Sequence, residues 1–328
     1  MNRPVAVIPV AGVGTRLLPH THTIPKALMS VAGKSMLAHI LDELREIGVE
    51  EFVLVVGYKG DRIREYMKSH YPGLTVSFVE QPERRGLGHA IHLTRDAVAG
   101  RPAVIVLGDT LFRVDFGQVF GRNVSQIGVK EVEDPRRFGI VEMEGERVSR
   151  FVEKPTHPTS RLAIVGIYYL VDTRPLYRSL GEMIDAGRTT KGEFQLTDAL
   201  QMMLESGVAM ETFPVEGWYD CGKRETLLET NRDLLDLGAI VPELPGSVVI
   251  PPVAVDPAAV VVNSIIGPYA SIAAGARVRD AIIRNSILSE GASVTGLLLD
   301  GSLIGEDAVV EGGFHGLNVG DSSEVRMK

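Results

Sequence analysis

Two glycines, an arginine and a lysine are concentrated in the stretch 11–28, which reads AGVGTRLLPHTHTIPKAL. These four residues are Gly12, Gly14, Arg16 and Lys26. No Asp or Glu occurs from residue 1 to residue 41, although the whole chain carries a net charge of -8. A flexible backbone with cationic side chains and no competing carboxylates suits a polyphosphate. The stretch therefore predicts a phosphate-binding loop.

Two common phosphate motifs do not fit this loop. Residues 33–35, Gly-Lys-Ser, resemble the end of a P-loop, but that motif requires a glycine where Leu28 stands. Residues 12–14, Gly-Val-Gly, begin like a dinucleotide fingerprint, but Leu17 occupies the third glycine position and no acid precedes Asp42. The sequence therefore supports neither an ordinary ATPase nor a nicotinamide-dependent dehydrogenase.

The elements that would position this loop alternate between strand and helix patterns. Apolar runs of strand length occur at 5–10, 51–58, 75–81 and 102–109. Helix patterns lie between them at 34–48, 60–71 and 87–100. This alternation predicts an α/β domain with a Rossmann-like parallel sheet and helices on both faces. Ligands of such sheets bind where the strands end, and the loop, Gln81 and Asp109 all fall at such ends.

The pattern then changes to short strands and turns over residues 127–170. We expect these strands to form an antiparallel or mixed extension of the sheet that covers the pocket. Further helices are predicted at 176–185, 194–205 and 224–237, with a strand in 210–222. Glycine and proline punctuate the chain near residue 240, which predicts a catalytic domain over 1–240 and a second domain over 241–328.

Aliphatic residues recur mostly every five or six positions in the second domain, with glycines and small residues between them. The recurring residues are Val253, Val260, Ile266, Ile272, Val278, Ile283, Leu288, Val294, Leu299, Ile304 and Val310. A helix has no such period, whereas a stacked β-solenoid with short coils does. The second domain is therefore predicted to be a β-solenoid, and a few irregular strands are the alternative.

The composition narrows the classes of partner and location. The single cysteine, Cys221, excludes an internal disulfide and a Cys-x-x-Cys metal site. No apolar run of about 18 residues occurs, so we expect no membrane span, and the first residues read as a strand and not as a signal peptide. The acidic balance argues against a nucleic-acid partner. We therefore expect a cytoplasmic protein.

Six segments follow one another in an order that is typical of one enzyme family. They are GVGTR with IPK, QPERRGLGHA, LGD, FVEKP, KGEFQLTDAL and GWYDCGK. Together they resemble the sugar-1-phosphate nucleotidyltransferase family over about residues 5–237, most of all its glucose-1-phosphate thymidylyl- and uridylyltransferase branch. The resemblance implies a nucleotide-binding α/β domain. Many members carry a left-handed β-helix behind it, which matches the predicted solenoid.

The resemblance assigns the phosphate loop to a nucleoside triphosphate. The residues implied to contact the nucleotide here are Ala11, Gly12, Gly14 and Thr15. Glycine at positions 12 and 14 would let backbone N–H groups approach the phosphates, and an ordinary strand-to-helix turn is the alternative for an isolated Gly-x-Gly. Arg16 would grip phosphate through its planar guanidinium, and Lys26 would act as a point charge as pyrophosphate leaves.

The same resemblance implies a Mg²⁺ site at two aspartates. Asp109 ends an apolar strand and would also border the nucleotide, while Asp220 lies in GWYDCG. Mg²⁺ suits carboxylate and phosphate oxygens, and it would bridge the α-phosphate as the sugar phosphate attacks. A carboxylate at a strand end is otherwise a helix cap or a turn former.

The sugar-phosphate side is implied to involve Gly139, Glu153, Lys154 and Gly166. Glu153 would accept hydrogen bonds from sugar hydroxyls, and Lys154 would contact the sugar phosphate. A surface ion pair is the alternative for an isolated Glu-Lys. The two glycines would mark places where the backbone meets the sugar, with strand bulges as the alternative.

The base-reading turn is implied to contain Gln81 and Gly86. A side-chain amide can pair with a pyrimidine edge, so Gln81 favours a pyrimidine, although one glutamine does not separate dTTP from UTP. Trp218 is expected to be a packing anchor.

These assignments predict transfer of a nucleotidyl group from dTTP, or next from UTP, to a sugar-1-phosphate, with glucose-1-phosphate as the expected acceptor. Arg16, Lys26, Lys154 and Mg²⁺ would position the reactants and neutralise charge, and no covalent protein nucleophile is needed. Other base specificity, such as that of a mannose-1-phosphate guanylyltransferase, is the alternative within the class. A non-catalytic, regulatory protein that binds an NDP-sugar is the alternative from another class.

The predicted β-helix is expected to serve assembly or regulation. An acyltransferase would need a histidine base and a longer helix, and this domain contains only His315. Flat faces and open apolar ends of a β-helix favour a homo-oligomer.

Overall fold

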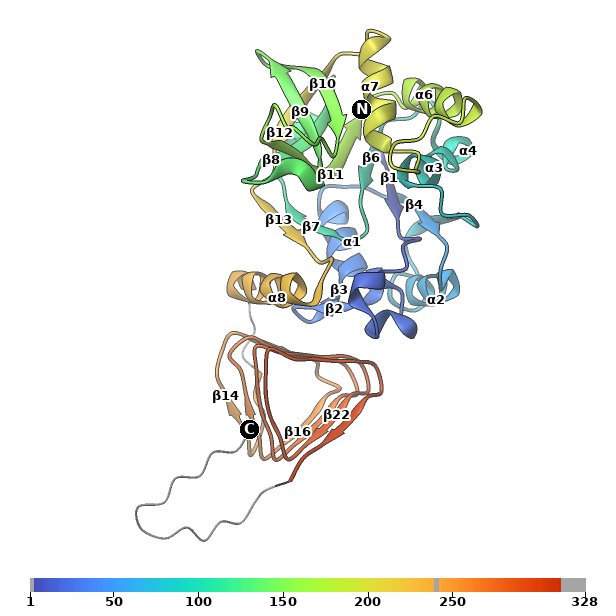
Figure 1. Cartoon of the computed structure of the whole chain (residues 1–328). Coiled ribbons are helices and arrows are strands. Elements are labelled where there is room, and N and C mark those ends of the chain that lie inside the picture. The colour runs from blue at the N-terminus through green and yellow to red at the C-terminus, as the bar shows by residue number, and fades with distance from the viewer. Residues whose placement is uncertain (1–2, 239–241, 314–328) are drawn as a thin grey trace. The chain divides into compact units, whose positions relative to one another are not determined.

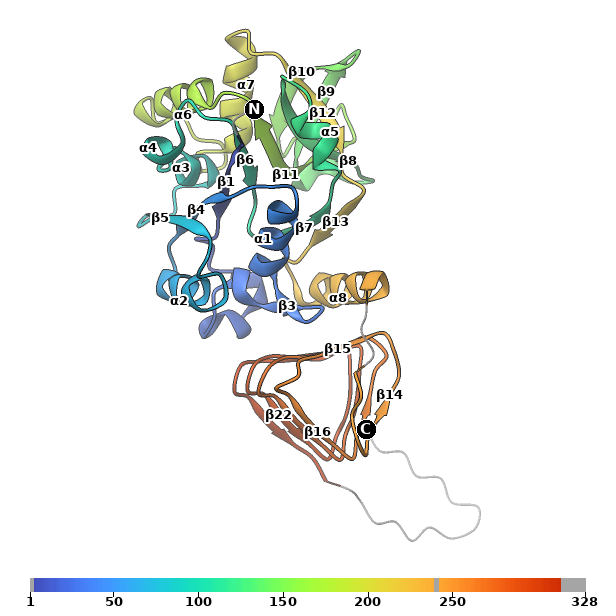
Figure 2. The ribbon, with the colours of Figure 1, turned by 180° about the vertical axis from the view of Figure 1, so that it is seen from behind.

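The computed structural model describes residues 3–238 and 242–313, and the chain separates into two compact units, Met1–Thr230 and Asn231–Lys328. Figures 1 and 2 show the ribbon from opposite sides. In the described parts of the chain, no helix is long and apolar enough to cross a membrane. His315 lies outside the described residues.

The first unit is built on a nine-stranded sheet with the order β5-β4-β1-β6-β11-β8-β12-β10-β9. Its parallel part comprises β1 (Val5–Pro9), β4 (Glu51–Val56), β5 (Thr75–Glu80) and β6 (Ala103–Val106). Val5 and Val7 lie in a buried cluster with residues of the flanking helices, and Ala6 and Ile8 are buried as well. Because side chains alternate along a strand, β1 is covered on both faces, as its unbroken apolar sequence predicts.

Helices of four to twelve residues connect or follow the strands of the sheet. They are α1 (Met36–Glu46), α2 (Gly60–His70), α3 (Leu87–His92), α4 (Arg95–Val98), α6 (Arg174–Asp185) and α7 (Leu196–Glu205). Helix α1 is shorter than predicted because Ser35 caps it, accepting a hydrogen bond from the Ala38 N–H at 3.0 Å. The single helix predicted over 87–100 was wrong: it is divided at Leu93–Thr94, where Thr94 Oγ1 donates to the Ile91 carbonyl at 2.7 Å.

The rest of the sheet is mixed, as predicted. It contains β8 (Ser125–Glu131), β9 (Gly139–Glu144), β10 (Arg147–Glu153), β11 (Leu162–Leu170) and β12 (Met210–Pro214). Strand β11 runs antiparallel to both β6 and β8, whereas β12 runs parallel to β8. This extension carries the glutamate and the glycines of the predicted sugar side.

A small separate sheet joins two distant segments at the edge of the predicted pocket. Strand β7 (Thr110–Arg113) pairs antiparallel with β13 (Gly217–Asp220), so Asp220 lies opposite Thr110. Helix α5 (Phe116–Phe120) follows β7, and helix α8 (Arg224–Gly238) follows β13. The strand predicted within 210–222 is thus two strands in different sheets.

The second unit contains three four-stranded parallel sheets, β14-β17-β20-β23, β15-β18-β21-β24 and β16-β19-β22-β25. The strands are β14 (Val248–Val249), β15 (Val253–Val255), β16 (Val260–Val262), β17 (Ile265–Ile266), β18 (Ala270–Ile272), β19 (Arg277–Arg279), β20 (Ile282–Arg284), β21 (Ile287–Leu288), β22 (Ser293–Thr295), β23 (Leu298–Asp300), β24 (Leu303–Ile304) and β25 (Val309–Glu311). Val248, Ile265, Ile282 and Leu298 are in register on successive coils, so one coil takes 16 or 17 residues. Three strands per coil explain the period of five to six, and they form the predicted left-handed parallel β-helix, whose coils are triangular (Figure 1).

Most of the recurring aliphatic residues fill the interior of this β-helix. Fully buried members are Val253, Ile266, Ile272, Val278, Ile283, Leu288 and Val294. Val260 is the exception: its side chain is 51% exposed, and its neighbour Val261, 9% exposed, takes the inward position. A shift of one residue turns a strand side chain to the opposite face, and both residues are valine, so the sequence offers no distinction between them.

We predict that Ile283→Ala destabilises the protein by about 2–5 kcal/mol, because Ile283 is fully buried and its loss leaves a cavity between coils. Ile282→Ala is the matched control, since its side chain lies on the same strand, points outward and is 37% exposed. The free energy of unfolding of both variants is measured in urea. Equal losses of unfolding free energy in the two variants would contradict the assignment of Ile283 to the interior and Ile282 to the surface.

Candidate active site

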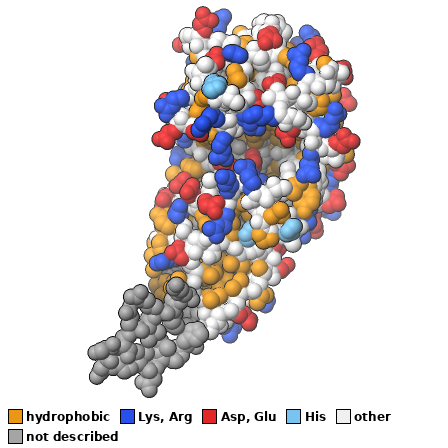
Figure 3. Space-filling view, viewed as in Figure 1, with side chains coloured by type: hydrophobic (Ala, Val, Ile, Leu, Met, Phe, Trp, Pro, Cys, Tyr) orange, Lys and Arg blue, Asp and Glu red, His pale blue; other side chains and the backbone are white. Residues whose placement is uncertain are grey.

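Two adjoining cavities lie where β1 and β6 end, with volumes of about 650 Å³ and about 320 Å³. Leu87, Leu107, Asp109 and Glu193 line both of them. The larger cavity is also lined by Arg16, Gly139, Glu153, Lys154, Gly166 and Asp220. The smaller one is also lined by Ala11, Gly12, Lys26, Gln81 and Gly86. Figure 3 shows the hollow in this face, with lysine and arginine side chains beside it.

The structure separates the roles of the two loop glycines. No protein atom lies within 4 Å of the position that a Cβ on Gly12 would take, so this backbone faces open space. Gly14 has a φ of 70°, and a Cβ there would lie 3.0 Å from side-chain carbons of Thr21 and Lys26. Gly14 is therefore needed for the fold of the loop. It lines neither cavity, and neither does Thr15, the exposed first residue of a 3₁₀ turn.

Lys26 and Asp109 form the ion pair at the centre of the site. Lys26 Nζ lies 2.6 Å from Asp109 Oδ2, and the lysine side chain is only 10% exposed against 43% for the aspartate. Lys26 begins a 3₁₀ turn directly after Pro25, whereas Asp109 is held between β6 and β7. A buried ammonium requires an anionic partner, and Asp109 supplies it.

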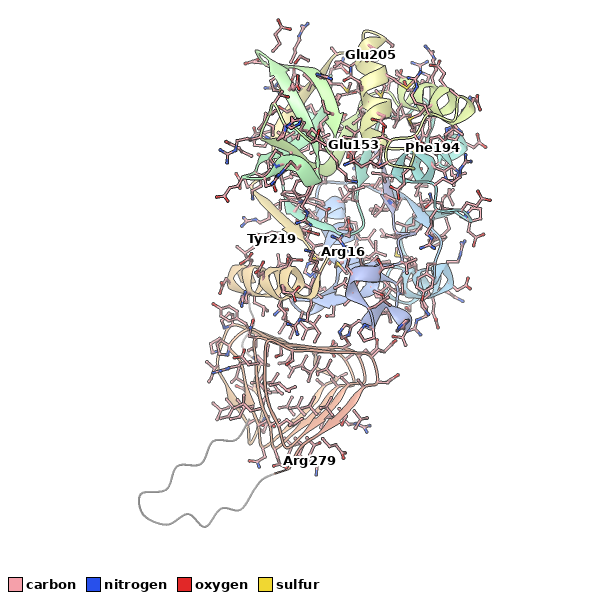
Figure 4. The ribbon with its side chains drawn as sticks, viewed as in Figure 1. Arg16, Glu153, Phe194, Glu205, Tyr219 and Arg279 are labelled. Atoms are coloured by element: carbon pink, nitrogen blue, oxygen red, sulfur yellow. The ribbon has the colours of Figure 1, made fainter. Side chains whose placement is uncertain are left out.

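The β7–β13 pair positions Asp220, and Arg16 reaches the same place from the 3₁₀ turn Thr15–Leu17. Asp220 Oδ1 accepts a hydrogen bond from the Gly222 N–H at 2.9 Å, which holds the carboxylate in a tight turn. A Cβ on Gly222 would lie 2.7 Å from Asp220 Oδ1 and 2.8 Å from Arg16 Nη2. The guanidinium therefore reaches the turn that presents Asp220, and Figure 4 labels Arg16 together with Tyr219 of β13.

The two aspartates fit a metal that arrives with a phosphate ligand. Among the described residues, no group of three or more His, Cys, Asp or Glu side chains is placed to hold a metal by itself. Mg²⁺ is commonly bound by one or two carboxylates together with substrate phosphates and waters. Asp109 and Asp220, which both line the larger cavity, would provide that donor set.

Glu153 is the buried anion of the larger cavity. Its side chain is 7% exposed, Thr197 Oγ1 donates to its Oε2 at 2.7 Å, and Lys154 Nζ lies 3.1 Å from its Oε1. Gly139 makes room for this arrangement, because a Cβ there would lie 2.8 Å from Thr197 Oγ1 and 3.1 Å from Glu153 Oε2. Figure 4 labels Glu153 at the end of β10.

Gly166 lies at a strand bulge in β11 and also lines the larger cavity. The register between β11 and β8 shifts between Ile164 and Tyr168, and Gly166 has a φ of 87°. Its carbonyl accepts a hydrogen bond from the Leu107 N–H at 3.0 Å, and a Cβ would lie 2.6 Å from Leu107 Cδ1. The glycine therefore positions Leu107, which borders both cavities.

Gln81 lies in the wall of the smaller cavity with its amide nitrogen engaged. Its Nε2 donates to the Gly86 carbonyl at 3.2 Å and lies 3.3 Å from His89 Nδ1. Burial is the main cause that lowers the pKa of His89, with the positive charge of Arg85 second, so its ring is neutral and Nδ1 can accept. Gly86 has a φ of 106°, and a Cβ there would lie 2.6 Å from the Phe194 carbonyl oxygen.

Several lining residues were missed by the sequence reasoning. Thr197, Arg137, Phe138 and Tyr168 line the larger cavity, and Arg84 lines the smaller one. Trp218 packs against Phe138 as an anchor, with ring centroids 5.0 Å apart, but it also lines the larger cavity. Thr197 lies in the motif KGEFQLTDAL, so its position in that motif could have indicated a residue of the site.

Comparison with known proteins identifies the family. Residues 5–236 match the family model described as nucleotidyl transferase. The chain belongs to the nucleotidyl transferase family. This confirms the membership that the six motifs indicated, and the match ends before the β-helix of this nucleotidyl transferase begins.

Relatives of this nucleotidyl transferase cover different shares of the chain. The low-salt glycan biosynthesis nucleotidyltransferase Agl11 of Haloferax volcanii is 35% identical over 69% of this chain and 64% of its own length. The glucose-1-phosphate thymidylyltransferase of Streptomyces antibioticus is 30% identical over 98% of this chain and 99% of its own. The crystal structure of a UDP-glucose pyrophosphorylase with UDP-glucose has a TM-score of 0.63 and 25% identity, covering 72% of this chain and 100% of that one.

Cys221 lies directly behind the charged residues of the site. It is fully buried, and burial raises the pKa of its thiol to about 12, an effect that the positive charge of Lys26 partly opposes. The thiol is therefore protonated throughout the neutral range, and it packs as a small apolar side chain.

We predict that Cys221 of the native protein does not react with the disulfide reagent DTNB at pH 8. The thiolate is the nucleophile, and a pKa near 12 in a fully buried position leaves almost none of it accessible. In denaturant the pKa returns to its ordinary value, and we expect one thiol per chain to react rapidly, as measured by absorbance. Native protein that reacted as fast as unfolded protein would contradict the placement of this residue.

Proposed function

We propose that this nucleotidyl transferase transfers the thymidylyl group of dTTP to glucose-1-phosphate, with UTP as the next-best nucleotide. The observation that carries the proposal is the pair of cavities that meet at Asp109. The smaller cavity offers the phosphate loop and Gln81 to a nucleotide, and the larger one offers Glu153 and Lys154 to a sugar phosphate. The products are an NDP-sugar and pyrophosphate.

The proposed reaction is an in-line displacement at the α-phosphorus. An oxygen of the sugar phosphate forms the new bond to this phosphorus, while the bond to the oxygen that bridges to the β-phosphate breaks. That oxygen leaves with the bonding electron pair as part of pyrophosphate, so no covalent protein nucleophile takes part. Catalysis then consists of positioning the two phosphates and neutralising their charge.

Three cations of the chain are placed to supply this neutralisation. Arg16 and Lys154 line the larger cavity, and Lys26 lines the smaller one beside Asp109. We assign Lys26 and Arg16 to the triphosphate and the departing pyrophosphate, and Lys154 to the sugar phosphate. Mg²⁺ held by Asp109 and Asp220 would act as a Lewis acid on phosphate oxygens.

The nucleotide loop has room for the backbone contacts of this assignment. The open space around Gly12 would let the N–H groups of the loop approach a phosphate, with Ala11 beside it in the cavity wall. Gly14 and Thr15 follow in the same turn, and Gly14 shapes it.

The hydrogen bonds of Gln81 support a base with a donor at N3. Its amide nitrogen is directed at the Gly86 carbonyl and at His89, which leaves its carbonyl oxygen to accept. Thymine and uracil carry N3–H, whereas N3 of cytosine is an acceptor. The Streptomyces antibioticus thymidylyltransferase, which aligns with 98% of this chain, supports the choice of dTTP over UTP.

On the sugar side, Glu153 supports a neutral hexose with free hydroxyl groups. Its carboxylate is buried and already positioned by Thr197, so it can accept from a hydroxyl without further ordering. Gly139 and Gly166 line the same cavity. Glucose is the sugar named for the thymidylyltransferase relative and the pyrophosphorylase structure.

The proposal also includes the organisation of the chain and its assembly. We place catalysis in residues 1–240 and an assembly or regulatory role in the β-helix of residues 241–328. An outward column of Val248, Ile282 and Leu298 on one β-helix sheet supports a homo-oligomer, because these large apolar residues are exposed. We place this assembly in the cytoplasm. Light scattering checks this assembly, and a monomeric mass would contradict it.

We predict that a matrix of five nucleoside triphosphates against several sugar-1-phosphates gives the fastest pyrophosphate release with dTTP and glucose-1-phosphate. UTP should come second and CTP far behind, because only thymine and uracil present N3–H to Gln81. Fastest release with GTP and mannose-1-phosphate would instead assign a guanylyltransferase. Binding without release across the whole matrix would favour the regulatory alternative.

We predict that Asp109→Asn lowers the rate of pyrophosphate release by about 10²- to 10³-fold, because it removes a charged ligand and the partner of Lys26 from the centre of the site. Asp185→Asn, at the exposed end of α6 and away from both cavities, is the control and should keep wild-type turnover. Near-normal turnover of Asp109→Asn would exclude the proposed metal role.

A further inference from the structure

The Lys26–Asp109 ion pair bears on when a divalent metal ion can bind to Asp109. Lys26 Nζ contacts Asp109 Oδ2 at 2.6 Å, the distance of a direct charge-assisted hydrogen bond. Asp109 is one of the two carboxylates that suit a divalent metal. The ammonium and a metal ion would therefore compete for the same carboxylate.

The burial of Lys26 makes this competition strong. Its side chain is only 10% exposed and is confined by Gly14, whose Cα lies so close that a Cβ there would be 3.0 Å from Lys26 Cβ. A lysine on the surface could turn into water when a metal arrived, but a buried ammonium without an anionic partner is costly. Two cations on one carboxylate also repel each other.

A triphosphate would remove this conflict. Lys26 lines the smaller cavity together with Ala11 and Gly12, the part of the loop that has open space for phosphate. Phosphate oxygens in that cavity would give Lys26 a new anionic partner and would supply the metal with the ligands that two aspartates lack. Metal and triphosphate would then each favour the binding of the other, because coupling between two ligands is reciprocal.

We propose that Lys26 acts as the counter-ion of Asp109 and thereby makes binding of a divalent cation depend on the presence of the triphosphate. Lys26 is then a positioning residue for the metal ligand before it contacts phosphate. This inference rests on the proposed function of the site, because it takes Asp109 as a metal ligand. It adds that the protein excludes free metal until the nucleotide arrives.

The test measures binding of Mn²⁺ alone to the intact protein by electron paramagnetic resonance, with no nucleotide or sugar present. Wild type should bind Mn²⁺ weakly, and Lys26→Met should bind it at least about tenfold more tightly, within the range usual for coupled sites. Lys26→Arg keeps the positive charge and should stay weak. Lys34→Met is the matched control, because Lys34 makes a similar pair with Asp42 at 2.7 Å but is 55% exposed and outside both cavities.

Two further variants keep the result interpretable. Lys26→Gln retains a hydrogen-bond donor for Asp109 without the charge, so it should also tighten Mn²⁺ binding. It replaces Lys26→Met in the test if that variant is too unstable to purify. Adding Asp109→Asn to either variant should abolish the increase in Mn²⁺ affinity.

Mn²⁺ binding to Lys26→Gln and Lys26→Met that is no tighter than wild type would overturn the proposal. So would a gain that survives Asp109→Asn, since the metal would then lie elsewhere. Failure of the proposed function has a different signature: no pyrophosphate release with any substrate pair, whatever the Mn²⁺ affinity.

Discussion

The antiparallel pairing of β7 with β13 places Asp220 opposite Thr110, the residue that follows Asp109. Asp109 and Asp220 come from distant parts of the chain, and both line the larger cavity. The pairing also carries the turn at Gly222, which the Arg16 guanidinium reaches from the phosphate loop. Backbone hydrogen bonds between two short strands thus align the segments of Asp109 and Asp220, and Arg16 approaches from a third segment.

Around this pair, the site balances charges whose burial would otherwise be costly. Lys26 is buried and is paired with Asp109, while Glu153 is buried and is paired with Lys154 and Thr197. Each buried ion therefore has a partner within the protein, and each pair lies on the wall of a cavity. The charged groups of both pairs are therefore balanced by contacts within the protein.

Glycines provide the remaining geometry, and they do so for different reasons. Gly86 and Gly166 have positive φ values and lie too close to neighbouring atoms to carry a Cβ. Gly12, by contrast, has open space in front of it. No contact inside the protein requires the absence of a side chain at Gly12, which lines the smaller cavity. In the β-helix, by contrast, the geometry comes from inward aliphatic residues that stack from coil to coil.

The amino-acid sequence determined the α/β class, the parallel strands, the β-helix period and the family, because these depend on local periodicity and on motifs of a few residues. Its errors were also local. Val260 and Val261 are chemically identical, and periodicity does not reveal the interruption of the 87–100 segment at Leu93–Thr94. Only the tertiary structure decided that Lys26 contacts Asp109, that Thr197 orients Glu153, and that Gly14 shapes the loop while Gly12 leaves space. These facts depend on distances between segments far apart in the chain, which strand pairing and burial set and which no spacing along the sequence encodes.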